Sequence, residues 1–244
     1  NIQKLNKITP YNSTDSKKKQ VGKMFDNIAK NYDFLNHSLS LGMDYYWRKK
    51  AIKYLTNNPK KILDVATGTA DFAISASKLG DVKITGIDIS EGMIEIGTKK
   101  IKRKGLENTI KLEIADSEKM SFSDNSFDAI TAGFGIRNFE NLQKGLSEMY
   151  RVLKKDGMIA ILEPSKPKIF PLKQIYQIYF HHIIPKLGSL ISKDNSAYTY
   201  LPNSVEEFPK GKKLIKHLQN VGFKSCTNIP LTFGIVDLYI AIKK

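Results

Sequence analysis

The nine residues LDVATGTAD, at positions 63–71, decide the fold of this chain. They begin as an apolar strand and continue, after the turn at Gly68, as a helix. A glycine lets the backbone approach a ligand with no Cβ in the way. Thr67 and Thr69 add hydroxyls, and the N-terminus of the following helix adds free N–H groups and a positive dipole end. The segment therefore predicts a ligand-binding turn.

Acidic residues follow at the ends of the next two strands. Asp88 comes twenty residues after Gly68, where a carboxylate accepts hydrogen bonds from both hydroxyls of a ribose. Asp116 and Ser117 end the third strand, and Asp116 is placed to contact an adenine amino group. Because open α/β sheets bind ligands at the carboxyl edge of the sheet, these residues predict a nucleoside site there.

The type of nucleoside follows from the glycines. Of the dinucleotide-binding motif G-x-G-x-x-G, only Gly68 is present, so a dinucleotide site is poorly supported. The P-loop motif G-x-x-x-x-G-K-[ST] does not occur, which excludes a P-loop. The set resembles the class I S-adenosylmethionine (SAM)-dependent methyltransferases. That resemblance implies SAM as the cofactor, and it puts Asp64 near the ammonium group or beneath the loop as a support. The alternative is a loop that merely closes an α/β unit.

Strands and helices alternate outward from this segment. Strands are predicted at residues 60–66, 82–88, 110–115, 127–134 and 158–163, with helical stripes between them. A long apolar helical stripe then runs from Leu172 to Leu187, and two final strands at 223–229 and 235–242 predict an antiparallel hairpin. We therefore expect an α/β, Rossmann-like, mostly parallel seven-stranded sheet with a C-terminal antiparallel hairpin.

The chain is expected to have a disordered segment, residues 1–16, followed by a single methyltransferase domain, residues 17–244. The first helical stripe starts at Lys17, and a second short helix is predicted from Tyr32 to Leu39. The expected parts of the domain are an N-terminal helical cap at 17–58, a SAM-binding core at 59–163, a substrate-side helical insertion at 164–210, and a final helix and hairpin at 211–244.

Composition excludes several classes of protein. The 244 residues are 41% hydrophobic and 26% charged, which excludes a disordered or collagen-like chain. One cysteine, Cys226, excludes a disulfide framework, and the four histidines lack metal-ligand spacing, so no metal is predicted. No apolar run reaches the ~18 residues that span a bilayer, and no secretory segment is visible. We therefore expect a cytoplasmic protein.

The net charge of +15 is unevenly distributed along the chain. It is +8 over residues 1–60, −2 over 61–140 and +9 over 141–244. The basic flanks favour either an ordinary solvated surface or contact with anionic lipid. A nucleic-acid partner is disfavoured, because 35 of the 39 basic residues are lysines and no basic–aromatic interleaving is present.

Longer stretches narrow the class. Five segments resemble the UbiE/COQ5 family of quinone C-methyltransferases: YDFLNHSLSLGMDYYW at 32–47, SDNSFDAIT at 123–131, FGIRNF at 134–139, RVLKKDGMIAILEPS at 151–165 and PLTFGI at 230–235. The chain departs from the family pattern at Asp44, usually His, and at Gly133, where some relatives have Ser. Lys155 and Asp156 stand where Pro-Gly is usual. Gly133 remains in the expected cofactor site.

The resemblance implies transfer of the SAM methyl group to a ring carbon of a prenylated quinol. A quinol hydroxyl has a pKa near that of Tyr, about 10. Its ionised form pushes charge onto the ring carbon that attacks the methyl. Arg137 is the candidate for stabilising this phenolate, and an ion pair of structural role is the alternative. Asn138 is a candidate for orienting the quinol oxygen, and Tyr200 and His181 are candidates for the base.

Demethylmenaquinol is the substrate that the resemblance favours, and it is converted to menaquinol. The alternatives are a methoxy-polyprenyl-benzoquinol of ubiquinone biosynthesis, an RNA methyltransferase, and a SAM-binding partner protein without catalysis. A bilayer-dwelling substrate makes peripheral contact with the inner face of the cytoplasmic membrane an expectation. A homodimer is expected from the resemblance alone.

Overall fold

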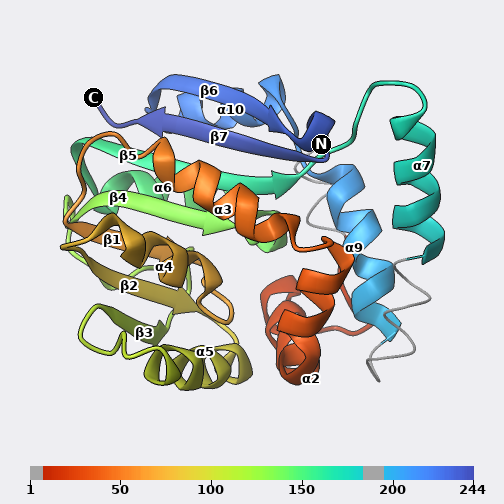
Figure 1. Ribbon diagram of the computed structural model, residues 1–244, viewed down its shortest axis with the longest axis horizontal. Helices are drawn as coiled ribbons and strands as arrows, with labels where there is room; N and C mark the ends of the chain where they lie inside the picture. Colours follow the sequence, from red (N-terminus) through yellow and green to blue (C-terminus); the bar gives the residue numbers. More distant parts are fainter. Residues whose placement is uncertain (1–7, 184–194) are drawn as a thin grey trace.

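The computed structural model describes residues 8–183 and 195–244. Its centre is a seven-stranded sheet of order β3-β2-β1-β4-β5-β7-β6 (Figure 1). The strands are β1 (Lys61–Val65), β2 (Lys83–Asp88), β3 (Ile110–Ile114), β4 (Phe127–Gly133), β5 (Leu153–Pro164), β6 (Lys224–Leu231) and β7 (Val236–Ile242). Strands β1 to β5 pair in parallel, and β7 is antiparallel to both β5 and β6. The predicted fold class is confirmed.

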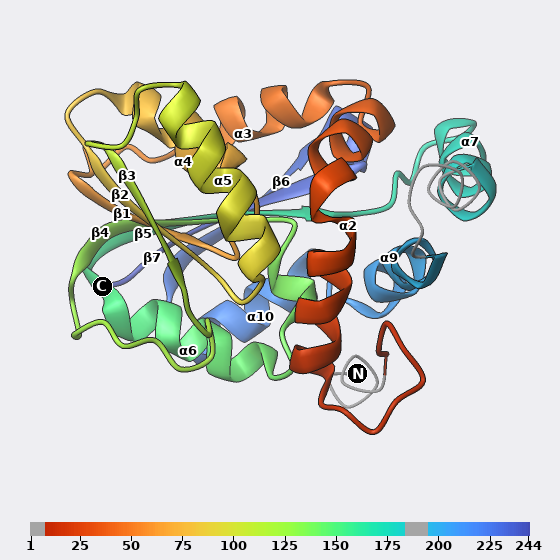
Figure 2. The same cartoon turned by 90° about the horizontal axis from the view of Figure 1, so that it is seen from below.

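Helices cover both faces of the sheet, and a third group stands at its end (Figure 2). One face carries α3 (Met43–Lys53), α4 (Asp71–Ala76) and α5 (Glu91–Arg103), and the other carries α6 (Leu142–Val152) and α10 (Lys212–Asn220). At the end to which β4 and β5 point stand α2 (Lys17–Leu39), α7 (Leu172–Ile178) and α9 (Asn195–Glu207). The carboxyl edge of the sheet therefore faces these three helices.

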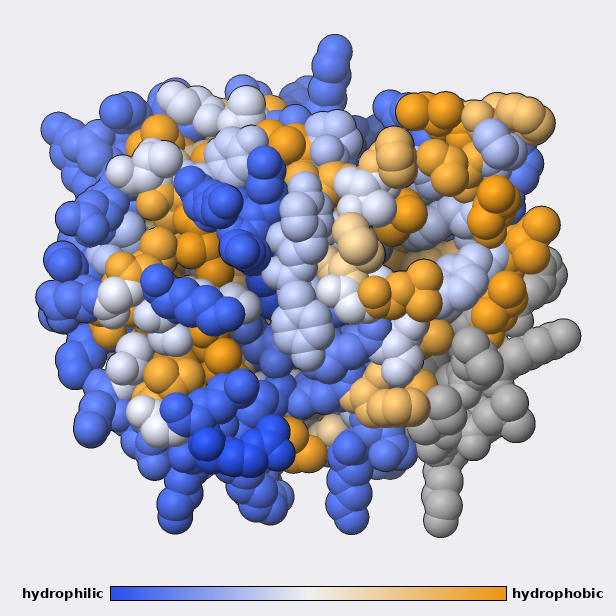
Figure 3. Space-filling view, in the orientation of Figure 1, coloured by the Kyte–Doolittle hydropathy of each residue, from blue (hydrophilic) through white to orange (hydrophobic). Residues whose placement is uncertain are grey.

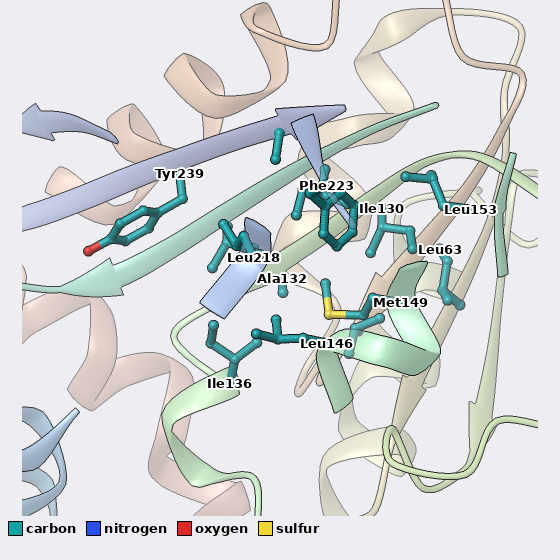
Figure 4. Close-up of a cluster of buried hydrophobic side chains, with 14 of the residues drawn as sticks. Leu63, Ile130, Ala132, Ile136, Leu146, Met149, Leu153, Leu218, Phe223 and Tyr239 are labelled. Atoms are coloured by element: carbon teal, nitrogen blue, oxygen red, sulfur yellow. The ribbon is translucent and has the colours of Figure 1, made fainter. Parts of the chain in front are cut away.

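Each face of the sheet has its own apolar core. On the side of α6, Leu142, Leu146 and Met149 recur at helical spacing and pack onto Leu63 and Ile130, all without solvent exposure (Figure 4). A second cluster fills the space between the opposite face and α3, α4 and α5. Burial on both faces explains why the central strands are continuous apolar runs.

The N-terminal cap begins with one long helix, where the sequence suggested two. Helix α2 begins after Ser16, whose hydroxyl caps it by accepting a hydrogen bond from the Lys19 backbone N–H at 3.3 Å. No glycine or proline interrupts it after Gly22. Residues 8–16 were expected to be disordered, but the Tyr11 backbone N–H donates to Gln20 Oε1 at 3.0 Å, which ties this segment to α2. Residues 1–7 lie outside the described residues.

The segment after β5 also differs from the expected single helix. Helix α7 ends at Ile178 and continues as a π-helical turn over Tyr179–Ile183, and residues 184–194 lie outside the described residues. Helix α9 covers Asn195–Glu207. In the two described ranges, no helix combines the length and apolarity needed to cross a membrane.

Candidate active site

The loop after β1 has an unusual backbone. Ala66, Gly68 and Ala70 have φ angles of 52°, 55° and 69°, in the left-handed region. Glycine adopts this region freely, whereas each alanine costs about 1–2 kcal/mol there. The loop is held to the neighbouring strand because the Thr67 backbone N–H donates to the Ile87 carbonyl at 2.9 Å. Its shape is therefore fixed by the protein before any ligand binds.

Asp88, at the end of β2, connects this loop to the start of α5. Its Oδ2 accepts from the Gly68 backbone N–H at 2.8 Å, and its Oδ1 accepts from the Ser90 N–H at 2.9 Å. The residue is only 8% exposed, and burial raises the pKa of the carboxyl. Each oxygen keeps a second lone pair, so the carboxylate can still accept hydrogen bonds from a ligand's hydroxyls.

A pocket of about 630 Å³, the cofactor pocket, lies at the carboxyl ends of the parallel strands. Five of the residues predicted to bind cofactor line it: Gly68, Asp88, Asp116, Ser117 and Gly133. Ile89 and Met93 add apolar side chains. This set fits SAM, because Asp88 would hold the ribose and the apolar side chains would cover the adenine. These assignments stay predictions.

Asp116 is already engaged within the protein. Its Oδ2 lies 2.7 Å from Lys18 Nζ on α2, and its Oδ1 accepts from the Glu118 backbone N–H at 2.9 Å. The predicted contact of Asp116 with an adenine amino group therefore stays a prediction. The ion pair holds α2 across the opening of the cofactor pocket, which Lys18 itself lines.

Asp64 supports the loop from below. It accepts hydrogen bonds from the hydroxyls of Thr67 at 2.5 Å and Thr131 at 2.7 Å, and from the Ala73 backbone N–H at 3.1 Å. It is fully buried and does not line the cofactor pocket. Asp64, Thr67 and Thr69 instead line a smaller polar pocket next to it. Of the two predicted roles for Asp64, contact with the SAM ammonium group or support of the loop, this geometry favours support of the loop.

The pH dependence of stability is expected to report on Asp64. Burial, the largest cause, raises the pKa of this carboxyl from 3.8 to about 6. The folded protein therefore binds more protons than the unfolded chain between these values, and stability falls as pH rises through them. We expect Asp64→Asn to remove roughly 2–3 kcal/mol of that fall between pH 4 and pH 7. Urea unfolding of both proteins at each pH measures it. Parallel pH curves for the two would contradict it.

Thr69 belongs to a polar network behind the loop. Its hydroxyl donates to Asp33 Oδ1 at 2.5 Å and accepts from Lys100 Nζ at 3.1 Å. Lys100 Nζ lies 2.5 Å from Asp33 Oδ2 and 2.7 Å from Asp71 Oδ1. The lysine ammonium thus bridges these two carboxylates. The expectation of a metal-free site is not tested by this arrangement.

Asp44, one of the departures from the family pattern, is held by hydrogen bonds from α2, α3 and the turn between them. Its buried carboxylate accepts from the Ser40 hydroxyl at 2.7 Å and from Arg48 Nη1 at 2.5 Å, and lies 2.7 Å from His37 Nδ1. These partners hold the pKa of Asp44 below its usual value against the opposing effect of burial, which is the largest single contribution. Asp44 joins α2 to α3 and lines neither pocket of the site.

A second, larger pocket adjoins the cofactor pocket. This apolar pocket has a volume of about 2050 Å³, including the part open to solvent, and lies between α2, α7 and α9. Its walls are mostly aliphatic and aromatic, among them Met24, Leu39, Trp47, Tyr176 and Ile235. Phe25, Tyr32, Phe134 and Asn138 line both pockets, and we call these four residues the dividing wall.

Arg137 lines the apolar pocket and also forms an ion pair. Its Nη1 lies 3.2 Å from Glu163 Oε2 and also donates to the Phe134 carbonyl, and its backbone N–H donates to Glu163 Oε1 at 3.3 Å. Its Nε is buried without a hydrogen-bond partner among the described residues. The ion pair of the structural alternative is therefore present, and one buried donor of the same guanidinium has no partner among the described residues.

The other predicted catalytic residues are partly brought together. The Tyr200 hydroxyl donates to Asn138 Oδ1 at 3.1 Å beside Arg137. Burial raises the pKa of Tyr200, and it raises the pKa of Tyr32 to about 12. Both phenols are therefore neutral near pH 7, which disfavours Tyr200 as a base and favours it as a donor that orients Asn138. The side chain of His181 lies outside the described residues.

Two residues of the site were missed by the sequence analysis. Glu163 is the second-last residue of β5, beside the strand that precedes Arg137. It lies in one of the family-like segments, so strand order could have revealed it. Lys18 left no signal, because its partner Asp116 is 98 residues away in the chain. Only the packing of α2 brings the two together.

The fold and the nucleoside-type pocket define a class I methyltransferase architecture, and comparison with known proteins agrees. A SAM-dependent methyltransferase from Aquifex aeolicus shares the fold, with a TM-score of 0.61 at 18% identity over 83% of this chain and 92% of that one. The model of the ubiE/COQ5 methyltransferase family matches residues 13–243. The chain belongs to this family and is a SAM-dependent methyltransferase, as the sequence predicted.

Curated relatives are similar over almost the whole chain. A demethylmenaquinone methyltransferase of Bacteroides fragilis is 53% identical over 97% of this chain and 98% of its own length. A ubiquinone/menaquinone biosynthesis C-methyltransferase, UbiE, of Geotalea daltonii is 45% identical over 93% of this chain and 97% of its own.

Proposed function

We propose that this protein methylates a ring carbon of a prenylated quinol, and that demethylmenaquinol is its substrate. SAM, when bound, supplies a methyl group on a positively charged sulfur. The dividing wall separates the two pockets by single side chains, so a ring in the apolar pocket can lie next to a cofactor in the other. The similarity to the Bacteroides fragilis demethylmenaquinone methyltransferase favours the naphthoquinol.

The observation that carries the proposal is a pair of unsatisfied polar groups in an apolar pocket. Arg137 Nε and the Tyr176 hydroxyl are both buried and without a hydrogen-bond partner among the described residues. Both residues line the apolar pocket. Leaving a buried donor unpaired costs about 1–3 kcal/mol, so a ligand gains that energy if its binding turns these two groups toward the pocket and pairs with them. A quinol is apolar with two oxygens and matches this requirement.

Arg137 would make the apolar pocket favour the ionised form of a quinol. A guanidinium stays charged at all ordinary pH values, so it cannot serve as an ordinary base, but it stabilises an adjacent phenolate. Glu163 fixes the guanidinium from the opposite side. The ionised quinol oxygen makes its neighbouring ring carbon nucleophilic. That carbon would form a bond to the methyl group as the bond from methyl to sulfur breaks, and it would then release its hydrogen as a proton when the ring becomes aromatic again.

The alternatives are separated by what each substrate needs. The Geotalea daltonii relative, whose name includes ubiquinone, keeps a benzoquinol as the second candidate. An RNA methyltransferase is disfavoured, because a pocket of this volume and apolarity does not suit a nucleotide. A partner protein without catalysis is disfavoured by the retained Gly68 and Asp88. Peripheral membrane contact and a homodimer also remain proposals.

A methyl-transfer assay is expected to place the label of SAM in demethylmenaquinol. A short-tailed quinol in detergent would be compared with the oxidised quinone, a prenylated methoxybenzoquinol and bulk RNA. The oxidised quinone is expected to stay unlabelled, because it has no hydroxyl to ionise. Label in the benzoquinol alone would move the substrate to ubiquinone biosynthesis, and label in RNA alone would overturn the proposal.

A further inference from the structure

Exposed apolar side chains gather around the mouth of the apolar pocket. Leu41 is 85% exposed, and Ile175 and Ile178 are each 58% exposed, yet all three line that pocket. Just before α7, Ile169 and Phe170 are 57% and 77% exposed without lining it. Figure 3 shows apolar side chains over α7 and the segment leading into it, at the right edge of the view. Large apolar patches on a soluble protein mark contact sites.

The same part of the chain carries charge of a single sign. The described residues 164–178 contain three lysines, Lys166, Lys168 and Lys173, and no Asp or Glu, and Lys166 lies 2.5 Å from Glu206. Two of them, Lys168 and Lys173, are exposed and flank Phe170 in the sequence, with no ion-pair partner among the described residues. Apolar side chains interspersed with lysines are typical of a surface that lies in the headgroup region of an anionic membrane.

We propose that α7 and the segment before it, residues 166–178, dock on an anionic bilayer and hold the mouth of the apolar pocket against the lipid. The inference rests on the proposed function for its meaning, because a prenyl tail would then pass from bilayer to pocket without crossing water. The charge complementarity favours lipid over a second copy of this chain, whose matching face would carry the same positive charge.

Vesicle binding tests the docking surface directly. The whole protein would be co-sedimented with vesicles of phosphatidylcholine alone and of phosphatidylcholine mixed with phosphatidylglycerol. We expect binding to the anionic vesicles, weakened more than about tenfold in the double variant Ile169→Glu/Phe170→Glu. Lys168→Glu/Lys173→Glu is also expected to weaken it, since each basic residue near the surface contributes attraction.

Two lysines elsewhere give a matched control. Lys102 and Lys104, at the end of α5, are also exposed, and α5 packs against β3, an edge strand of the sheet. Lys102→Glu/Lys104→Glu changes the net charge by the same amount and is expected to leave vesicle binding within about twofold. An equal loss in both lysine pairs would overturn the docking surface in favour of general charge attraction.

Activity separates this inference from the proposed function. With a short-tailed quinol in detergent, Ile169→Glu/Phe170→Glu should methylate at the wild-type rate, whereas with a long-tailed quinol in anionic vesicles it should be at least about tenfold slower. Wild-type vesicle binding by this variant would overturn the docking surface alone. A wild-type protein that binds vesicles yet methylates neither quinol would overturn the proposed function alone. A change of oligomeric state in the variant, with unchanged vesicle binding, would identify a second copy as the partner.

Discussion

Replacing Asp88 by alanine is expected to weaken SAM binding by about 100-fold or more. Hydrogen bonds to a charged group contribute about 1.5–3 kcal/mol each, so loss of two to a ribose predicts a change of this size. The substitution also removes the acceptor of the Gly68 and Ser90 N–H groups, which loosens the loop that shapes the pocket. Isothermal titration of SAM into the purified variant measures the affinity.

A surface aspartate provides the control for this change. Asp81 is almost fully exposed and lies 3.3 Å from Lys60, with no part in the pocket. Asp81→Ala should bind SAM as the wild type does, and Asp88→Asn should fall between, because its amide keeps one acceptor oxygen. Unchanged SAM affinity in a folded Asp88→Ala protein would rule out the ribose role.

Arg137→Ala is expected to lower kcat near pH 7 by about 10–10³, because a neighbouring cation lowers the pKa of an acid by about 1–3 units and its loss leaves less of the quinol ionised. SAM affinity should change little, since Arg137 lines the apolar pocket and not the cofactor pocket. Single-turnover methylation of the quinol at saturating SAM measures the chemical step. Arg103→Ala, an exposed arginine at the end of α5, is the matched control.

The ion pair with Glu163 requires a second variant. Removing Arg137 alone leaves a buried carboxyl unpaired, and breaking a buried pair costs about 3–5 kcal/mol of stability. Arg137→Met combined with Glu163→Gln removes both charges and isolates the loss of the cation from the quinol. A double variant with wild-type kcat would show that Arg137 only neutralises Glu163 and would refute phenolate stabilisation.

The fold and the cofactor pocket could be predicted because their signals are local. The strand-turn-helix at Gly68 and the acidic residue that ends β2 are each read from a few adjacent residues. The parallel sheet then brings Gly68, Asp88, Asp116 and Ser117 to one edge without further information. Whether Asp64 lines this pocket or supports the loop could not be read from the sequence, and the structure places it beneath the loop.

The remainder depends on contacts between distant segments. The pair of Lys18 with Asp116 and the hydrogen bond from the Tyr179 hydroxyl to the Leu39 carbonyl arise only when α2 and the helical segment 172–183 close over the sheet edge. The periodicity of residues 172–187 predicted one continuous helix, yet the hydrogen bonding changes to a π-helical turn after Ile178. Apolar spacing identifies the buried face of such a segment but not where its regular winding stops.

The dividing wall would keep SAM and the proposed quinol in surroundings of different polarity. Asp88, Asp116 and Ser117 give one side polar and charged groups, suited to a charged, water-soluble donor. The other side is the apolar pocket, lined by Met24, Leu39 and Trp47, and it suits a molecule that partitions into lipid. The dividing wall lies between the two pockets, formed by Phe25, Tyr32, Phe134 and Asn138. In the proposed reaction, a methyl group passes from the cofactor pocket to the apolar pocket across a single layer of side chains. The charged donor stays among polar groups and the quinol stays among apolar ones.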